Sequence, residues 1–226
     1  GAVNIKGEGD SPEIHFYDTV KGGDFLANQP LCKDMCYHAP FVIYLLDRLG
    51  VPFNRTPEGN LDFRRFGGTL HHRTAFAGAT TGQQLLYALD EQVRRFETQG
   101  LVEKMEWHEY LGAVLDSEGR CVGATINNLR NGEIRAERGD AVILATGGPG
   151  LVYGRSTNSM VCTGTATTSA YLQGAKYGNA EFIQIHPSAI PGRDKLRLMS
   201  ESARGEGGRV WVPKNPGDER KPRNVP

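Results

Sequence analysis

The chain has 226 residues, of which 38% are hydrophobic and 23% charged; this is ordinary for a soluble globular protein and enough for one large domain or two small ones. Lysine plus arginine total 26 and aspartate plus glutamate total 26, so no broad electrostatic preference for nucleic acid or an anionic membrane follows. No apolar run is long enough to span a bilayer.

The first 50 residues predict two helices. Residues 1–28 are mostly polar and predict an extended loop with a short helix near residues 14–21. From residue 30 to residue 49 apolar side chains recur with a helical period. One stripe of this second helix is expected to be buried: Met35, Phe41, Leu45 and Leu49. Pro40 is expected to kink or divide the helix, and Gly50 fits its C-terminus.

A loop-rich segment, residues 51–79, precedes a third helix. We expect three aromatic anchors in this loop: Phe53, Phe63 and Phe66. Thr80 or Thr81 can cap the helix, which is predicted to reach about Thr98 before Gly100 ends it. Its apolar positions fit a period of 3.6 residues: Leu85, Leu86, Leu89, Val93 and Phe96.

After residue 100 the pattern changes to short strands. Four runs predict strands: residues 101–107, 110–115, 121–129 and 133–138. Turn residues at 116–119 and 131–132 join them into hairpins. The fully apolar residues 141–145 predict a buried strand that runs into the turn Thr146-Gly147-Gly148. In parallel sheets, a strand that ends in such a glycine turn places its backbone next to a nucleotide cofactor.

The last third predicts a helix over residues 165–177, closed by Gly178, and a strand over residues 182–185 that ends at His186. The cysteines are not spaced as zinc ligands, and we interpret them as reduced thiols: Cys32, Cys36, Cys121 and Cys162.

Two of the candidate sites consist of single motifs. The bare backbone of Ala145, Thr146, Gly147 and Gly148 can lie against a flavin or its phosphates, or can be an ordinary strand-to-loop turn. His186 can donate to a carboxylate, or can be a structural histidine bonded to backbone.

Two further candidate sites are clusters. In residues 200–208 (SESARGEGG), Ser200 supplies a hydroxyl, and Glu201 and Arg204 are spaced to pair on one helical turn. Such a pair can pass protons in a closed site or can lie on the surface with little effect. Phe66, with the basic residues 71–73, either lines a ligand cavity or is structural.

Taken together, these motifs resemble the flavoprotein subunit of succinate dehydrogenases and fumarate reductases. The matching segments follow the family's order over nearly the whole chain: residues 17–22 (YDTVKG), 66–68 (FGG), 73–75 (RTA) with 81–82, 144–148 (LATGG), 182–187 (FIQIHP) and 200–208. Residues 202–211 and 174–177 are most similar to the branch with a diheme membrane anchor.

The resemblance implies an α/β (α+β) fold. Residues 1–181 would form a partial Rossmann-like FAD-binding domain with an inserted β-meander, and residues 182–226 the start of a truncated capping domain. The implied reaction interconverts succinate and fumarate by hydride transfer to or from FAD. By position, His186, Ser200 and Phe66 would bind substrate, and Glu201 and Arg204 would deliver the proton.

FAD would contact residues 145–148 and Thr165, although the chain has Thr163-Gly164-Thr165-Ala166 where the family often has TGDG. The resemblance places a GxGxxG phosphate loop and a flavin-linking histidine upstream of Gly1, and a catalytic arginine beyond Pro226. We therefore expect the isolated chain to be inactive and to bind FAD weakly or not at all.

The implied partners are an iron–sulfur subunit and a quinone-binding, haem-containing membrane anchor of the respiratory chain and tricarboxylic acid cycle. The flavoprotein would be peripheral, on the cytoplasmic face of the cell membrane. Two alternatives stay open at this point. One is an L-aspartate oxidase-like flavoenzyme, which shares the HP and RGEG motifs, and the other is a non-catalytic flavoprotein fragment.

Overall fold

The structure, a computed structural model, describes residues 9–66, 69–180, 182–183, 186, 188–194, 196–200, 202–205, 207–209, 211, 213 and 215–218. The chain divides into two compact units, Gly1–Glu103 with Glu201–Pro226, and Lys104–Ser200. Helices and strands both contribute, which confirms the predicted mixed class. No helix in these residues is long and apolar enough to cross a membrane.

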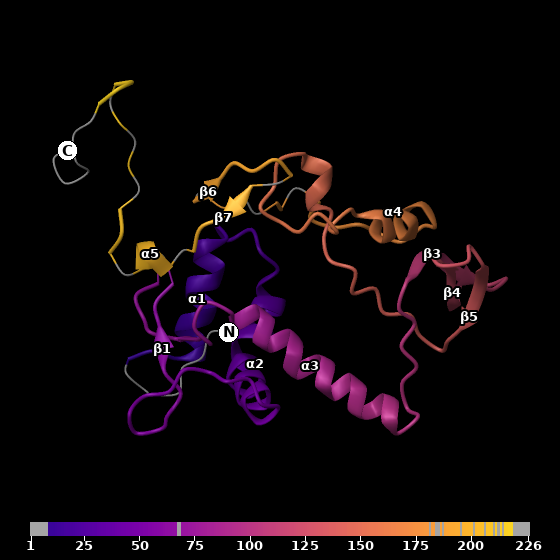
Figure 1. Cartoon of the computed structure of the whole chain (residues 1–226), viewed down its shortest axis with the longest axis horizontal. Helices are drawn as coiled ribbons and strands as arrows, with labels where there is room; N and C mark the ends of the chain where they lie inside the picture. The colour runs from indigo at the N-terminus through magenta and orange to yellow at the C-terminus, as the bar shows by residue number, and fades with distance from the viewer. Residues whose placement is uncertain are drawn as a thin grey trace. The chain divides into compact units, whose positions relative to one another are not determined.

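The first unit begins with helix α1 (Pro12–Gly22), slightly longer than predicted. Ser11 caps it by accepting a hydrogen bond from Ile14 N at 3.1 Å, and Pro12 supplies a preset φ at the first helical position. Helix α2 (Gln29–Arg48) packs against α1 (Figure 1).

Helix α2 differs from the prediction in two ways. It continues through Pro40 without division; proline removes one backbone donor, and the neighbouring turns hold the helix. The predicted buried stripe is wrong for Met35, Phe41 and Leu45, which are exposed, whereas its last member, Leu49, packs against the core. Cys36 and Ile43 are the buried residues of the helix. The helix carries two apolar stripes, and periodicity alone does not say which of them meets the core.

The core of this unit lies where α2 ends and the following loop returns. It consists of Ile43, Val51, Phe53, Leu61, Phe63, Ala75 and Ala88. Phe63 belongs to strand β1 (Phe63–Arg64), which pairs antiparallel with β2 (Thr74–Ala75). Gly50 turns the chain after α2 with a φ of +96°, a left-handed conformation that a side chain would strain. The anchoring roles predicted for Phe53 and Phe63 are therefore confirmed.

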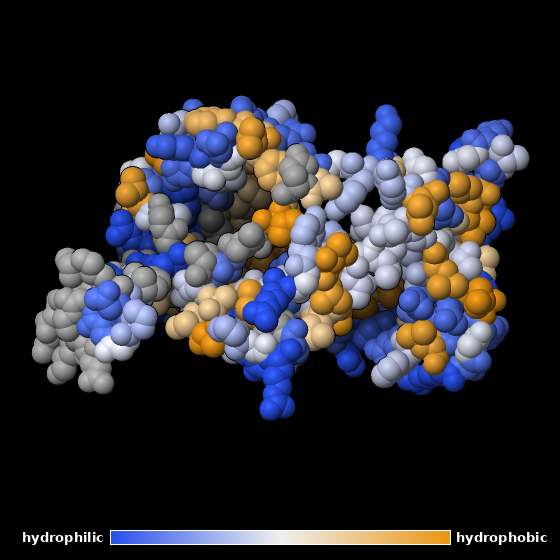
Figure 2. Space-filling view, turned by 90° about the horizontal axis from the view of Figure 1, so that it is seen from above, coloured by the Kyte–Doolittle hydropathy of each residue, from blue (hydrophilic) through white to orange (hydrophobic). Residues whose placement is uncertain are grey.

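Helix α3 (Thr81–Thr98) confirms the third predicted helix. Thr80 is its N-cap residue by position, and Thr81 Oγ1 accepts from Ala77 N at 3.0 Å. Much of its apolar face is exposed: Leu86, Leu89 and Val93. Figure 2 shows such hydrophobic side chains in orange at the molecular surface.

The second unit contains a three-stranded antiparallel meander in the order β3 (His108–Leu115), β4 (Cys121–Asn128) and β5 (Ile134–Arg138). Both predicted hairpin turns are present, and Asp116 Oδ1 closes the first by accepting from Glu118 N and Arg120 N at 2.9 Å each. The strand predicted at residues 101–107 is wrong, because this segment forms loop and turn.

Helix α4 (Thr165–Leu172) lies beside β3 (Figure 1). Gly174, at a φ of +99°, follows its C-cap, so the helix ends earlier than the predicted Gly178. The short elements of the chain are a 3-10 turn η1 (Gly150–Tyr153), strands β6 (Ala189–Ile190) and β7 (Arg197–Leu198), and helix α5 (Ser202–Gly205).

The predicted buried strand at residues 141–145 is absent. These residues have no regular secondary structure, and Ile143 is 88% exposed. A strand exists only when a neighbour completes its hydrogen bonds, and the described residues supply no such neighbour. The predicted strand at residues 182–185 lies partly outside the described residues.

Candidate functional site

The glycine turn at residues 145–148 is exposed. Gly147 has a φ of +76°, and a Cβ there would lie 3.5 Å from Cys162 Sγ. A Cβ on Gly148 would meet nothing within 4 Å. The backbone of this turn is therefore packed on one side and open on the other, as a loop that lies against a ligand must be.

The same turn lies against the start of α4. Leu151 N donates to Cys162 O at 3.0 Å. Gly164 has a φ of +77°, and a Cβ there would come within 2.8 Å of Pro149 Cβ, so only glycine allows this approach. The structure thus brings the turn near Thr165, the first residue of α4.

These features fit a phosphate-bearing cofactor such as FAD. The N-cap of α4, Gly164, carries no side chain that could occupy the first N–H groups of the helix, and helix N-termini favour negative charge. The Thr165 hydroxyl lies 3.3 Å from that of Thr163. FAD contacts at the turn and at Thr165 are therefore compatible with the geometry, and they remain predictions.

His186 is buried, with 7% of its surface exposed. Its Nδ1 lies 3.0 Å from Ser188 O and 3.2 Å from Ser188 N. A neutral ring with its proton on Nε2 accepts from Ser188 N, whereas a protonated ring donates to Ser188 O. Ser188 therefore orients the ring through Nδ1, and a carboxylate would be bound through Nε2.

Ser200 lies at the same end of a hairpin as His186. Strands β6 and β7 pair in the register Ala189 to Leu198, and Met199 N donates to Ser188 O at 2.9 Å. Ser188 O thus contacts both the His186 ring and the residue before Ser200. Two predicted substrate residues that are 14 positions apart in the sequence therefore flank the same end of this hairpin.

The predicted proton-delivery pair is described only in part. Arg204 lies in α5 and is half-buried, while Glu201 lies outside the described residues. Arg204 belongs to the first unit, and His186 and Ser200 belong to the second. The pairing of Arg204 with Glu201 therefore stays a prediction.

The Phe66 loop is held by its own backbone and side chains. Phe66 is half-buried, and Thr69 makes hydrogen bonds to its N–H and to its carbonyl group. The Arg64 guanidinium lies over two rings, 5.6 Å from the centroid of Phe66 and 4.6 Å from that of Phe76. Gly67 and Gly68 lie outside the described residues.

Arg73, one of the basic residues in this cluster, has a structural role. Only 2% of its side chain is exposed. Its Nε and Nη2 donate to Asp10 at 2.9 and 2.7 Å, and Nη2 lies 2.8 Å from Asp18 Oδ2. Arg73 is therefore a structural residue that ties the segment before α1, and α1 itself, to β2.

The roles of Thr69, Asp10 and Asp18 are not evident from the sequence. A threonine directly after two glycines is a weak signal of a side-chain-closed turn. Nothing in the sequence pairs Asp10 with an arginine 63 positions away.

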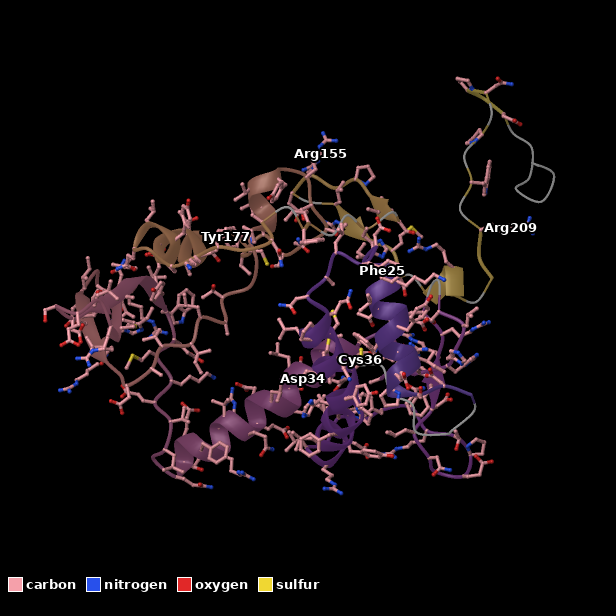
Figure 3. The ribbon with its side chains drawn as sticks, turned by 180° about the vertical axis from the view of Figure 1, so that it is seen from behind. Phe25, Asp34, Cys36, Arg155, Tyr177 and Arg209 are labelled. Atoms are coloured by element: carbon pink, nitrogen blue, oxygen red, sulfur yellow. The ribbon has the colours of Figure 1, made fainter. Side chains whose placement is uncertain are left out.

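Two titratable groups lie near the Arg73 cluster. Burial lowers the pKa of His15 from its ordinary value of 6.5, and the Arg73 charge lowers it further. Burial raises the pKa of the Cys36 thiol, partly offset by a hydrogen bond with Thr19. Figure 3 shows Cys36 on α2.

All four cysteines are free, and no group of three potential metal ligands occurs among the described residues.

Comparison with known proteins identifies the family of this chain. The model of the FAD binding domain family matches residues 2–221. The chain is 71% identical over 215 residues to the succinate dehydrogenase flavoprotein subunit of Bacillus subtilis, covering 95% of this chain and 37% of the relative. It is 36% identical to the fumarate reductase flavoprotein subunit of Escherichia coli, covering 95% of this chain and 35% of the relative.

Solved structures agree as well. A variant of the E. coli quinol fumarate reductase subunit FrdA matches with a TM-score of 0.85 at 35% identity, over 92% of this chain and 34% of that one. The Mycobacterium smegmatis Sdh1 complex with UQ1 matches with a TM-score of 0.81 at 29% identity, over 90% of this chain and 36% of that one. The chain spans little more than a third of the length of these relatives. Because the family model covers nearly the whole sequence, the chain belongs to the FAD binding domain family.

Proposed function

We propose that this chain is the central section of the flavoprotein of a succinate–fumarate oxidoreductase. The observation that carries the proposal is the β6–β7 hairpin, where Ser188 O lies 3.0 Å from His186 Nδ1 and accepts from Met199 N, the residue before Ser200. A dicarboxylate needs directed donors for its oxygens, and an imidazole beside a hydroxyl can supply them. The 71% identity to a succinate dehydrogenase subunit supports the dehydrogenase over an L-aspartate oxidase.

Each residue then has a separate task. FAD, when bound, supplies the two-electron acceptor or donor. The turn at residues 145–148 and Thr165 hold it. His186 and Ser200 bind a substrate carboxylate, and Phe66 forms an apolar wall beside the substrate. Glu201 and Arg204 move the proton that the reaction exchanges with solvent.

Steady-state kinetics of the full-length parent test the substrate assignment. We expect succinate oxidation with an artificial electron acceptor and no comparable turnover of L-aspartate. His186→Ala should raise KM for succinate and lower kcat, because it removes an interaction that both the bound substrate and the transition state use. Robust aspartate oxidation without succinate turnover would contradict the proposal.

Arg204→Ala separates proton delivery from substrate binding. A group that acts only in proton transfer stabilises the transition state, so kcat per mole of FAD should fall by about 10²-fold or more with KM nearly unchanged. If Arg204 only shapes the glycine-rich segment, thermal stability and FAD content should fall together while kcat per FAD stays at the wild-type value.

The proposed complex includes an iron–sulfur subunit and a quinone-binding, haem-containing anchor, which would hold the flavoprotein on the inner face of the cell membrane. The similarity to a quinol fumarate reductase subunit and to Sdh1 in complex with UQ1 supports this. To test this complex, a tagged parent protein is purified from the membrane fraction, and the iron and haem that co-purify with it are measured. A parent that purifies alone from the soluble fraction, fully active with quinone, would contradict it.

A further inference from the structure

Residues 149–164 form a loop whose two ends lie side by side in the second compact unit. Leu151 N donates to Cys162 O at 3.0 Å across the base of this loop. Next to that bond, a Cβ on Gly164 would come within 2.8 Å of Pro149 Cβ, so the two backbones are in close contact. The base of the loop therefore joins the glycine turn to the start of α4.

The side chain of Cys162 packs against the glycine turn. Its Sγ lies 3.5 Å from the position that a Cβ on Gly147 would take, so no further atom fits between the thiol and the turn. Cys162 is half-buried and forms no disulfide. Its backbone is fixed on both sides, because its N–H donates to Ser159 O at 3.0 Å and its carbonyl accepts from Leu151 N. The thiol is thus a spacer of defined size between the loop and the turn.

The position of the turn depends on this spacer because the turn is packed on one side only. Gly147 has no side chain of its own to hold it, and its φ of +76° is one that glycine adopts without strain. On the other side, a Cβ on Gly148 would meet nothing within 4 Å. Groups that bind a ligand must be held to within about 0.5 Å of their productive positions, and a side chain one carbon longer than cysteine needs more room than that.

We propose that Cys162 is a positioning residue for FAD, whose side chain sets the distance between the glycine turn and the N-terminus of α4. This inference rests on the proposed function, in which the turn and Thr165 hold the cofactor. Cys162 lies on the packed side of the turn, whereas the cofactor would lie on the open side. The size of the thiol is therefore what matters, and its acidity and redox chemistry are not used.

The test titrates the apo form of the full-length parent flavoprotein, prepared from a riboflavin-starved host, with FAD. Quenching of flavin fluorescence gives the Kd, and visible circular dichroism reports the surroundings of the bound flavin. Cys162→Leu enlarges the spacer, Cys162→Ala shortens it, and Cys162→Ser keeps its approximate size. Cys32→Leu is the matched control, because Cys32 is also half-buried but lies on α2, in the other compact unit.

For Cys162→Leu we expect the Kd of FAD to rise about tenfold or more and the visible circular dichroism to change, because an overpacked contact displaces the turn. Cys162→Ala should raise the Kd several-fold, since the turn can move into the space left by the sulfur. Cys162→Ser and Cys32→Leu should bind FAD as the wild type does. A purely structural role would lower the Tm of the apo protein and leave both FAD readouts unchanged. A wild-type Kd in Cys162→Leu, or in Cys162→Ala should the larger variant not fold, would overturn the inference.

Gly148→Ala separates a failure of this inference from a failure of the proposed FAD contact. The added Cβ meets nothing in the protein, and the φ of Gly148 lies outside the left-handed region, so the Tm of the apo protein should not change. With FAD against the open side of the turn, the same Cβ takes space that the cofactor needs, and the Kd should rise about tenfold. Weak binding by Gly148→Ala with wild-type binding by Cys162→Leu would overturn the role of Cys162 alone. Wild-type binding by both variants would overturn the proposed contact and the inference together.

Discussion

Breaking the buried ion cluster of Arg73 should lower the free energy of unfolding more than breaking any exposed ion pair among the described residues. Arg73→Met removes a guanidinium that is 2% exposed and leaves Asp10, 7% exposed, without its cation. Removing one partner of a buried pair costs about 3–5 kcal/mol, because the remaining charge stays desolvated. Domains are stable by only about 5–15 kcal/mol in total, so a large share of the stability is at stake.

Urea unfolding of the purified chain, followed by far-UV circular dichroism, measures this cost as a shift in midpoint at constant slope. Arg94→Met is the control, because its pair with Asp90 is exposed and should contribute less than about 0.5 kcal/mol. The double variant Arg73→Met/Asp10→Asn should be less destabilised than Arg73→Met, since no buried charge remains unpaired. A cost below about 1 kcal/mol for Arg73→Met, or strict additivity in the double variant, would refute the reasoning.

Three further predictions concern single residues. The fold lowers the pKa of His15, so the stability linked to its neutral ring is complete above pH 6.5 and is lost as the pH falls through the lower folded pKa. Tm should therefore fall more between pH 7.5 and pH 5 in the wild type than in His15→Gln. Equal falls in Tm would contradict this. At pH 8, iodoacetamide should modify exposed Cys121 well before buried Cys36. Peptide mass spectrometry measures the order of modification. The reverse order would show that the structure around Cys36 opens readily. Gly164→Ala should destabilise the chain by about 2 kcal/mol or more in urea, because its φ is +77° and the added Cβ meets Pro149; wild-type stability would mean that this contact is not kept.

Helices and turns whose capping or turn residues lie close together in the sequence were predicted well. Helix α3, its glycine stop and the two hairpin turns depend on residues within a few positions of one another, such as Asp116 with Glu118 and Arg120. Helix α1 likewise carries its own cap at Ser11. Such signals need no knowledge of distant parts of the chain.

Features that depend on distant partners were not predicted. The buried side of α2 is decided by what packs on Ile43, and a strand at residues 141–145 would need a neighbouring strand. The hairpin whose one end is flanked by His186 and Ser200 depends on a two-residue strand pair, β6 with β7. Such a pair is too short to be recognised from an alternating sequence pattern. Residue types thus suggest candidate site residues, whereas how distant segments come together cannot be predicted from the sequence alone.

The edge of the meander carries a last testable feature. Strand β3 pairs with β4 on one side, and on the other its backbone meets side chains of the α4 segment. Ala113 N donates to Gln173 Oε1 and Gln173 Nε2 donates to Ala113 O, both at 2.8 Å. Ser169 Oγ donates to Leu111 O at 2.6 Å. The glutamine amide thus takes the place of a neighbouring strand, and it blocks an edge that could otherwise pair with a second chain.

Gln173→Ala should therefore lower stability modestly and increase self-association. Because Gln173 is exposed, water replaces part of what is lost, and we expect about 1 kcal/mol. Gln173→Glu should be worse at pH 7, since a carboxylate oxygen would then face the Ala113 carbonyl where the amide donated. Sedimentation velocity over a range of concentrations measures the association, with Gln83→Ala, an exposed glutamine of α3, as the control. If Gln173→Ala associates no more than this control, the side chain does not protect the edge, and the neighbouring Ser169 bond or the body of α4 must be sufficient to cover β3.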